Sequence, residues 1–477
     1  MKMNMFTAIL VLCLLSAAVI ACSGTETSDS SVYSLTTPSI SEGTGSPADH
    51  QSDSPIEIPE STVTIDPTMA KPITDVSGRN SEVMDEATKK QPDAPVVLAW
   101  PEDVGSNHFG KLGDDISGWE GGWIRPHAGR FIWGLIEPKA GEYDWKFTTD
   151  KRVERWQDKN LAVLVTIWPF ATWDQDSCNH DKPEAIGAFP GMGTHLYYPC
   201  NEEAYIDWLT AVVERYDGDG IDDMPGLKYP IRHWEVLNEP EMQGPKLTFY
   251  QEDSQSYLKL LKVSYRAIKS ADSESVVLSG GQAGMQSKFV DYWQPILRGA
   301  SGYFDLGNIH SISSSDLDFF ASEYRTFLDE NGFGSTEFWV TEALVGTPPR
   351  EQKLSEDQLA RRTMTGYASS FAAGADIIFN VGGHDPTGGP GSLSEKTVEV
   401  MAQTLGEFIG VSPLDDNLIE FEMPSGSTVF VLWDNAVLPP SVSGEVTVID
   451  YLGNENIEEA IEVSGSSPRM IIVGPRP

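Results

Sequence analysis

Residues 232 to 241 read RHWEVLNEPE, a short apolar run that ends abruptly in Asn238, Glu239, Pro240 and Glu241. The run has the length and composition of a buried strand, and Pro240 takes the chain out of it into a loop. A carboxylate in this place is either the ordinary polar end of a strand or a group positioned for chemistry. The rest of the chain must decide between these two interpretations.

Seven other short apolar runs recur between residues 95 and 410, and helical stretches separate them. EAYIDWLTAVVERY is one such stretch, with its apolar residues at helical spacing. Eight strands that alternate with helices predict an α/β fold, the (β/α)8 TIM barrel. The predicted strands cover residues 95–100, 122–127, 161–168, 232–238, 275–280, 303–310, 337–342 and 375–381.

The chain on either side of this barrel has a different composition. Residues 411–477 contain short strands separated by turn residues, such as STVFVLWD and PRMIIVG, and predict a small C-terminal all-β domain of β-sandwich-like form. We expect it to pack on the barrel as a structural cap, with glycan binding as the alternative. Residues 23–94 are rich in Ser, Thr and Pro with almost no aromatic side chains, so they predict a disordered linker.

Residues 1–22 have the pattern of an export signal, with Lys2 followed by an apolar stretch too short to span a bilayer. The sequence VIAC, Val19 to Cys22, resembles the lipobox of bacterial lipoproteins. This resemblance implies that Cys22 is lipidated and that the protein is extracytoplasmic, anchored to a bacterial membrane or cell surface only through this lipid. A plain signal peptide with a chance cysteine is the alternative.

The remaining cysteines and the charge restrict compartment and partners. Once Cys13 leaves with the signal and Cys22 carries the lipid, Cys178 and Cys200 are the only pair left, and we expect a disulfide between them. The formal net charge of -38 repels polyanions. Nucleic acid and strongly anionic glycans are therefore poor partners, and a neutral substrate fits better.

Two predicted strands end in glutamate, and their spacing points to an active site. Glu239 ends the fourth strand and Glu342 the seventh, 103 residues apart, which corresponds to three βα units with some surplus. Three steps round an eight-stranded ring place the two carboxylates on facing sides of the barrel mouth. Glycoside hydrolysis needs such a pair, one to protonate the leaving oxygen and one to attack carbon or activate water. Glu235 should lie deeper inside the barrel and Glu241 in the loop.

The residues around these glutamates carry a family resemblance over most of residues 95–410. WEVLNEP resembles the Asn-Glu-Pro signature of the clan of retaining (β/α)8 glycosidases (clan A), and FWVTEALVG resembles the nucleophile segment of their seventh strand. GRFIWGLIEPKAGEYDW, residues 129 to 145, is similar to the segment after the second strand in glycoside hydrolase family 39 and its relatives in families 5 and 42.

This resemblance implies a role for each matching residue. Glu239 would be the acid/base, Glu342 the nucleophile, and Asn238 a hydrogen-bond partner of the sugar hydroxyl next to the anomeric carbon. Arg125 would lie under the nucleophile and His310 in the inner shell. Physical chemistry agrees, because Arg125 favours an ionised Glu342 and the charge of Glu342 favours a protonated Glu239.

Several further residues have two interpretations each. Trp168 and Trp173 follow the third strand and either stack on sugar rings or pack in the core. His127 either faces the substrate or is structural. Members of the clan present a tryptophan at the end of the eighth strand, whereas this chain has IIFNVGGHDP, so that Phe379 or the turn at residues 380–384 takes its place.

No metal or cofactor is predicted. DGDGIDD, residues 217–223, lacks oxygen ligands at the fifth and twelfth positions that an EF-hand needs, so a solvated acidic turn is favoured over another kind of calcium site. The chain has no HExxH, GxSxG, P-loop or GxGxxG motif.

These observations favour a retaining β-glycosidase that hydrolyses O-glycosidic bonds of neutral oligo- or polysaccharides with two glutamates. The alternatives are a non-catalytic glycan-binding surface lipoprotein and a transglycosylase that uses the same site.

Overall fold

The structure is a computed structural model that describes residues 96–119, 121–126, 130–187, 191–245, 247–314, 317–345, 354–381, 391–463, 467–475 and 477. The predicted signal peptide at residues 1–22 with Cys22, the linker at 23–94 and His127 lie outside these residues. Within the described ranges, no helix has both the length and the apolar character needed to cross a bilayer.

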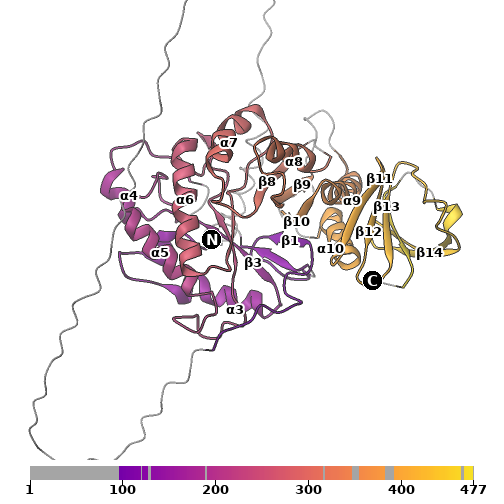
Figure 1. Ribbon diagram of the computed structural model, residues 1–477, viewed down its shortest axis with the longest axis horizontal. Helices are drawn as coiled ribbons and strands as arrows, with labels where there is room; N and C mark the ends of the chain where they lie inside the picture. Colours follow the sequence, from indigo (N-terminus) through magenta and orange to yellow (C-terminus); the bar gives the residue numbers. More distant parts are fainter. Residues whose placement is uncertain are drawn as a thin grey trace, which may run out of the picture. The chain divides into compact units, whose positions relative to one another are not determined.

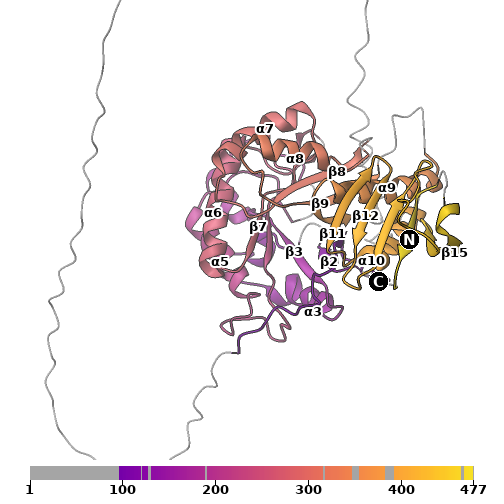
Figure 2. The same ribbon diagram turned by 45° about the vertical axis from the view of Figure 1, so that its right-hand side comes forward.

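Eight parallel strands form a barrel, as the sequence predicts (Figures 1 and 2). The sheet order is β7-β4-β3-β2-β1-β10-β9-β8. Bridges between Leu278 and Leu306 and between Gln282 and Ile309 join the two ends and close the ring. The barrel strands are β1 (Phe109–Leu112), β2 (Trp123–Arg125), β3 (Ala162–Ile167), β4 (His233–Val236), β7 (Val276–Leu278), β8 (Gly307–Ser314), β9 (Phe338–Val345) and β10 (Ala375–Asn380).

Helices follow most of the strands and cover the outside of the ring. Several begin at a side chain that accepts from the first turn, as Asp253 does from Ser256 and Ser355 from Gln358. The helices are α2 (Trp133–Ile136), the π-helix η2 (Lys146–Asp150), α3 (Lys151–Gln157), α4 (Thr172–Cys178), α5 (Glu202–Glu214), α6 (Ser254–Ala271), α7 (Ser287–Gly299), α8 (Ala321–Glu330), α9 (Glu356–Ala372) and α10 (Leu393–Leu405).

The first predicted strand is wrong. Residues 96–100 are not a strand, and Val96 and Val97 are 72% and 73% exposed. The first barrel strand is β1, whose sequence FGKL lacks an apolar pattern because two of its four positions have special tasks. Gly110 makes room for the Phe379 ring, and Lys111 forms a buried ion pair with Glu395 of α10 at 2.9 Å.

The barrel interior has an apolar lower layer and a polar upper layer. Trp123, Trp339 and Phe379 fill the lower layer together with aliphatic side chains. His233 stacks on Trp339 there at 5.2 Å, and burial lowers its pKa to about 3, so it is neutral and its role is structural. Polar side chains point inward one step nearer the C-terminal ends of the strands, where active sites of this fold lie.

The C-terminal region is all-β, as predicted, but its strands form one antiparallel sheet of order β11-β12-β13-β16-β14-β15 and not a sandwich. The sheet lies beside α9 and α10 (Figure 1). Phe421 and the residues that alternate with it on the same face pack into the barrel core, where Phe421 contacts Phe371 of α9 and Phe408. The opposite face carries a small cluster of its own, which includes Leu432. The strands are β11 (Gly410–Asp415), β12 (Leu418–Glu422), β13 (Thr428–Leu432), β14 (Glu445–Asp450), β15 (Glu455–Glu459) and β16 (Arg469–Val473), with η3 (Ala460–Glu462).

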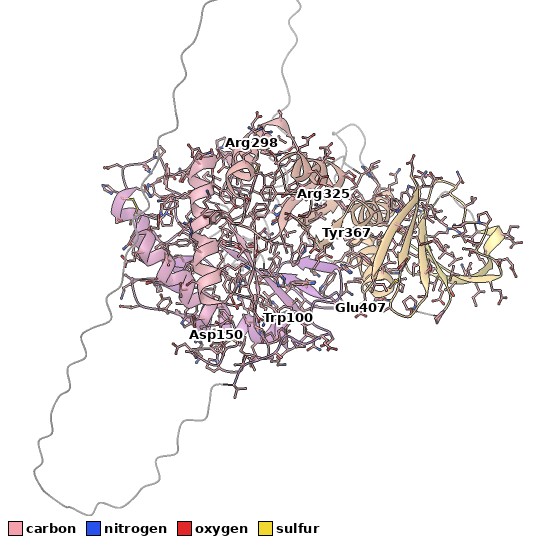
Figure 3. The ribbon with its side chains drawn as sticks, viewed as in Figure 1. Trp100, Asp150, Arg298, Arg325, Tyr367 and Glu407 are labelled. Carbon is pink, nitrogen blue, oxygen red and sulfur yellow. A yellow bond between two sulfur atoms is a disulfide. The ribbon has the colours of Figure 1, made fainter. Side chains whose placement is uncertain are left out.

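Polar bonds join the same two parts. Thr397 of α10 donates to the Tyr451 carbonyl at 2.8 Å, and Arg361 of α9 donates to the Tyr451 hydroxyl at 3.0 Å. Tyr367, labelled in Figure 3, continues the packing toward the barrel by stacking on Phe109 of β1 at 5.5 Å. The sheet therefore caps the helices α9 and α10, as the sequence favours.

Because the sheet and the barrel share one core, we expect them to unfold together. Phe421→Ala should lower the free energy of unfolding by about 3–5 kcal/mol and move a single calorimetric transition. Leu414→Ala, at a half-exposed position of β11, should change it by less than about 0.5 kcal/mol. Two transitions, of which only one moves in Phe421→Ala, would contradict a shared core.

Candidate active site

The end of β4 places Asn238 and Glu239 through an irregular backbone. Leu237 donates its N–H to the Ile167 carbonyl at 3.1 Å, and Glu239 donates to the Gly281 carbonyl at 3.0 Å, so the chain stays between its neighbouring strands. Leu237 and Glu239 have φ values of 67° and 39°. Residues other than glycine rarely adopt such φ values. These values persist only where the surrounding structure holds the backbone, as is common at functional sites.

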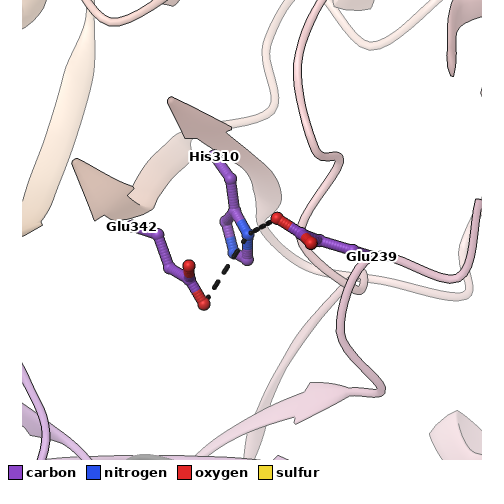
Figure 4. Close-up of side chains that lie close together, drawn as sticks. All are labelled: Glu239, His310 and Glu342. Carbon is purple, nitrogen blue, oxygen red and sulfur yellow. Dashed lines mark hydrogen bonds and ion pairs between the residues drawn. The ribbon is translucent and has the colours of Figure 1, made fainter. Parts of the chain in front are cut away.

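Glu239, His310 and Glu342 come together at the mouth (Figure 4). A register shift between Ile309 and His310 brings His310 of β8 opposite Glu342 of β9. His310 Nδ1 lies 2.9 Å from Glu239 Oε1 and 3.8 Å from Glu342 Oε1. One ring nitrogen and one oxygen of each carboxylate all lie within 4.8 Å of one another. The structure thus joins the two glutamates that the sequence pairs across 103 residues.

Arg125 lies under this group as predicted and is almost completely buried. Its Nη1 donates to Glu342 Oε1 at 2.7 Å, its Nη2 to Asn238 Oδ1 at 2.6 Å and its Nε to Glu235 Oε2 at 2.8 Å. One guanidinium therefore fixes residues from β4 and β9 at the same time. Because Asn238 uses its oxygen on Arg125, its amide NH2 is the group left to face a ligand.

Glu235 is inside the barrel, as the sequence indicates, and is the centre of the polar layer. Besides Arg125, it accepts from Thr166 and from Asn308, and the Thr341 hydroxyl lies 3.2 Å from its Oε1. Thr341 also lies 2.9 Å from His310 Nε2, so that Glu235 is linked to the imidazole through this hydroxyl. The layer thus holds both Arg125 and His310 in place from below.

The charges of these groups are strongly coupled. Burial raises the pKa of Glu239, and so does the charge of Glu342, although His310 acts in the opposite direction. Burial alone would lower the pKa of His310, but Glu342, Glu235 and Glu239 raise it to about 9. Burial would also raise the pKa of Glu235, but Arg125 and its hydrogen bonds hold it at about 2. The pKa of His310 therefore favours a charged imidazole near neutral pH, and the pKa of Glu239 is shifted toward its protonated form.

A metal ion does not suit this group of residues, although two carboxylates and an imidazole are common ligands. A ligating imidazole must offer a ring lone pair. The charged form of His310 has none, and its two ring nitrogens each lie 2.9 Å from a protein oxygen, Glu239 Oε1 and the Thr341 hydroxyl. Arg125 already supplies positive charge to Glu342.

The other predicted site residues have varied positions. Trp168 is only 2% exposed and packs on Phe249 at 5.9 Å, in agreement with the packing interpretation. Trp173 is half-buried, packs on Trp133 at 5.0 Å and donates to the Glu137 carbonyl. Phe379 belongs to the lower barrel layer, so it does not replace the missing tryptophan at the mouth.

The loop after β3 is closed by the predicted disulfide. Cys178 and Cys200 are bonded, which confirms the pairing. Asp174 accepts from the backbone of Cys200 at 2.9 Å and closes the same turn. The loop is joined to the loop after β4, because Gln251 and Leu196 exchange two hydrogen bonds of 2.8 Å.

The acidic loop at residues 217–223 uses its carboxylates internally. Asp223 accepts from the N–H groups of Gly218 and Gly220, and Asp217 and Asp219 each accept from an N–H two residues on. Glu214, Asp217 and Asp219 have oxygens within 4.8 Å of one another. Burial raises the pKa of Asp217 to about 7. These bonds describe an acidic turn whose carboxylates cap its own N–H groups.

Neither a protein-family model nor a curated protein matches the chain. Its fold is similar to that of a family 39 glycoside hydrolase from Bacteroides cellulosilyticus WH2, with a TM-score of 0.52, 16% identity, and coverage of 77% of this chain and 81% of the other. It is also similar to a family 39 β-xylosidase from Caulobacter crescentus, with a TM-score of 0.51, 14% identity, and coverage of 79% and 98%.

A third similar structure is the family 51 α-L-arabinofuranosidase from Thermotoga petrophila RKU-1, with a TM-score of 0.51, 12% identity, and coverage of 80% and 98%. At these low identities the likeness shows the fold. The chain therefore has the (β/α)8 fold found in families 39 and 51 of the glycoside hydrolases, and this confirms the fold that the sequence resemblance implies.

The sequence did not predict a role for the supporting residues Thr166, Asn308, Thr341 and Gly281. The first three were detectable in principle, because each is a polar residue at an inward-facing position of a predicted barrel strand. Gly281 had a weaker signal in the pair Gly280-Gly281 at the end of the fifth strand. A Cβ at position 281 would lie 1.9 Å from His310 Nε2, so only glycine lets the imidazole occupy its place.

The low pKa of Glu235 predicts a pH-dependent stability. A carboxyl whose pKa is depressed in the folded state stabilises the fold above its unfolded pKa and loses this contribution as pH falls through the folded pKa. Glu235→Gln removes one of the two carboxylates bonded to the buried Arg125 and should cost on the order of 3–5 kcal/mol at pH 7. The difference from wild type should shrink as pH falls from about 4.5 toward 2, as measured by urea unfolding.

The exposed Glu274→Gln is the control. A penalty of Glu235→Gln that is the same at pH 7 and pH 3 would show that the ionised form of Glu235 does not stabilise the barrel.

Proposed function

We propose that this protein is a retaining β-glycosidase that hydrolyses O-glycosidic bonds of neutral oligo- or polysaccharides. The observation that carries the proposal is the pair Glu239 and Glu342, with oxygens within 4.8 Å, one glutamate bonded to Arg125 and the other tending to stay protonated. Retaining glycosidases have carboxyl groups about 5–5.5 Å apart, whereas inverting ones need about 6.5–9.5 Å to admit a water. The separation therefore favours retention.

In the first step, Glu342 attacks the anomeric carbon and Glu239 gives its proton to the leaving oxygen. Arg125 Nη1, at 2.7 Å, favours the ionised form of Glu342 that can act as nucleophile. Asn238 offers its amide NH2 toward the hydroxyl next to the anomeric carbon. The carbon–oxygen bond of the aglycone breaks, and a glycosyl ester of Glu342 forms.

In the second step, Glu239 accepts a proton from water as the water attacks the ester. Esterification removes the charge of Glu342, and the repulsion that raised the pKa of Glu239 disappears with it. His310, at 2.9 Å from Glu239 Oε1, stabilises the carboxylate that Glu239 has become. The sugar leaves with its original anomeric configuration, and Glu239 regains its proton for the next cycle.

The substrate class and the compartment belong to the same proposal. The net charge of -38 supports a neutral glycan, because it would repel an anionic one. The disulfide supports an oxidising compartment outside the cytoplasm. Together with the lipobox-like VIAC sequence, it supports a protein anchored by a lipid at Cys22.

Removal of the nucleophile tests the mechanism. Glu342→Gln should abolish turnover of a panel of aryl β-glycosides, xylosides and glucosides first, by on the order of 10⁴-fold or more, while thermal unfolding shows that it still folds. NMR of the first product released by the wild type should show the β-anomer.

Each other outcome has its own meaning. An α-anomer as first product would exclude a retaining mechanism. A wild type that releases no sugar from any β-linked substrate would favour a glycan-binding protein. Products longer than the substrate would indicate transglycosylation.

A further inference from the structure

The ends of β4 and β7 are joined by three successive links that flank Glu239. Below it, the Tyr257 hydroxyl of α6 donates to the Val236 carbonyl and accepts from the Gly280 N–H, at 3.0 and 2.7 Å. At Glu239 itself, the backbone N–H donates to the Gly281 carbonyl. Beyond it, the Glu241 carboxyl accepts from the Ala283 N–H at 2.6 Å.

The third link replaces a backbone bond that the chain cannot make. After Glu239 the chain turns, with the Met242 N–H bonded to the Glu239 carbonyl at 2.9 Å, so no backbone carbonyl of β4 continues alongside Ala283. A buried N–H without an acceptor is costly. The side chain of Glu241 supplies the acceptor and thereby fixes the far end of the turn that carries Glu239.

The surroundings of Glu241 are those of a structural acceptor and not of a second acid at the surface. Its Oε2 and the indole N–H of Trp293 from α7 are both buried and have no other hydrogen-bond partner among the described residues, and the indole acts on this carboxyl to lower its pKa. Burial raises the pKa of Glu241 to about 8 against the effect of the Ala283 bond. At pH 7 it is therefore a neutral acid, and glutamine is its closest substitute.

The segment that Glu241 fixes also controls His310. The backbone N–H of Gln282, next to Ala283, donates to the Asn308 carbonyl at 3.2 Å. The backbone carbonyl of Gln282 accepts from the backbone N–H of His310 at 2.7 Å. Gly281 lies against the imidazole ring. A single short segment, residues 280–283, therefore contacts both the acid and the histidine hydrogen-bonded to it, and Glu241 is its side-chain link to the β4 turn.

We propose that Glu241 is a positioning residue for the acid/base Glu239, holding its strained backbone so that its proton points at the leaving oxygen. This proposal rests on the proposed glycosidase function and adds a residue to it. The Glu239 φ of 39° is maintained only if both ends of the turn are fixed, and Glu241 fixes the end that lies beyond Pro240.

The proposal predicts a dependence on the leaving group. A dinitrophenolate leaves without a proton, whereas an alkoxide needs one, so only poor leaving groups depend on a correctly aimed acid. Glu241→Ala should lower kcat/KM for methyl or p-methoxyphenyl β-glycosides on the order of 10- to 100-fold and for the dinitrophenyl β-glycoside less than about threefold. Because kcat/KM covers only the steps up to the glycosyl-enzyme, the second role of Glu239 does not enter.

Two further variants and a control complete the experiment. Glu241→Gln keeps an oxygen for the Ala283 N–H and should retain the wild-type ratio of the two kcat/KM values. Glu241→Asp is one methylene too short to keep the bond and should shift the ratio as Glu241→Ala does. Glu330→Ala, at the exposed end of α8, removes a carboxylate elsewhere. The ratio is independent of the amount of folded enzyme, and if Glu241→Ala does not fold, the Asp and Gln variants decide the result.

The outcomes separate this inference from the function it rests on. A wild type that hydrolyses none of the aryl β-glycosides overturns the proposed function and this inference with it. An active wild type with Glu241→Ala and Glu241→Asp losing activity equally on both leaving groups, or behaving as Glu330→Ala does, overturns the inference alone. A Glu241→Gln variant that changes the ratio as Glu241→Ala does also overturns it, because the acceptor would then not be what matters.

Discussion

The buried guanidinium of Arg125 is the interaction on which the site depends. It bonds to Glu235, Asn238 and Glu342, which come from two strands that lie on different sides of the barrel. A buried cation is stable only when it is paired and fully hydrogen-bonded. The same bonds that stabilise Arg125 therefore fix the ends of β4 and β9 at the barrel mouth. Neither Glu235 nor Glu342 can move without disturbing the buried charge of Arg125.

This requirement explains why the barrel interior is divided into layers. An ion placed among Trp123, Trp339 and Phe379 would have no partners, so the lower layer is apolar and even its histidine is neutral. One step higher, Thr166, Asn308 and Thr341 supply the hydrogen bonds that let Glu235 remain an anion in a dry environment. Stability below and chemistry above are thus separated within a single set of strands.

The sequence predicted seven of the barrel strands and the facing glutamates because both depend on local patterns, namely apolar runs and the residues that end them. It failed at β1, where Gly110 and Lys111 are chosen for contacts with Phe379 and Glu395, which lie more than 260 residues away in the chain. It placed Glu241 correctly in the loop after the strand but did not predict its bond to Ala283. That bond depends on the turn after Glu239 and on the segment at residues 280–283, and neither is visible in the motif itself.

The charges of the site suggest why a histidine lies between the two glutamates. In the resting enzyme of the proposed mechanism, His310 is charged and Glu239 is protonated, so that Arg125 and His310 balance Glu235 and Glu342. In the glycosyl-enzyme of the proposed mechanism, Glu342 has lost its charge and Glu239 has gained one, and the sum is again zero. A neutral imidazole would leave an uncompensated buried anion in both states, which is costly in a low-dielectric interior. The pKa of His310, raised by the carboxylates around it to about 9, keeps the balancing charge in place through both steps.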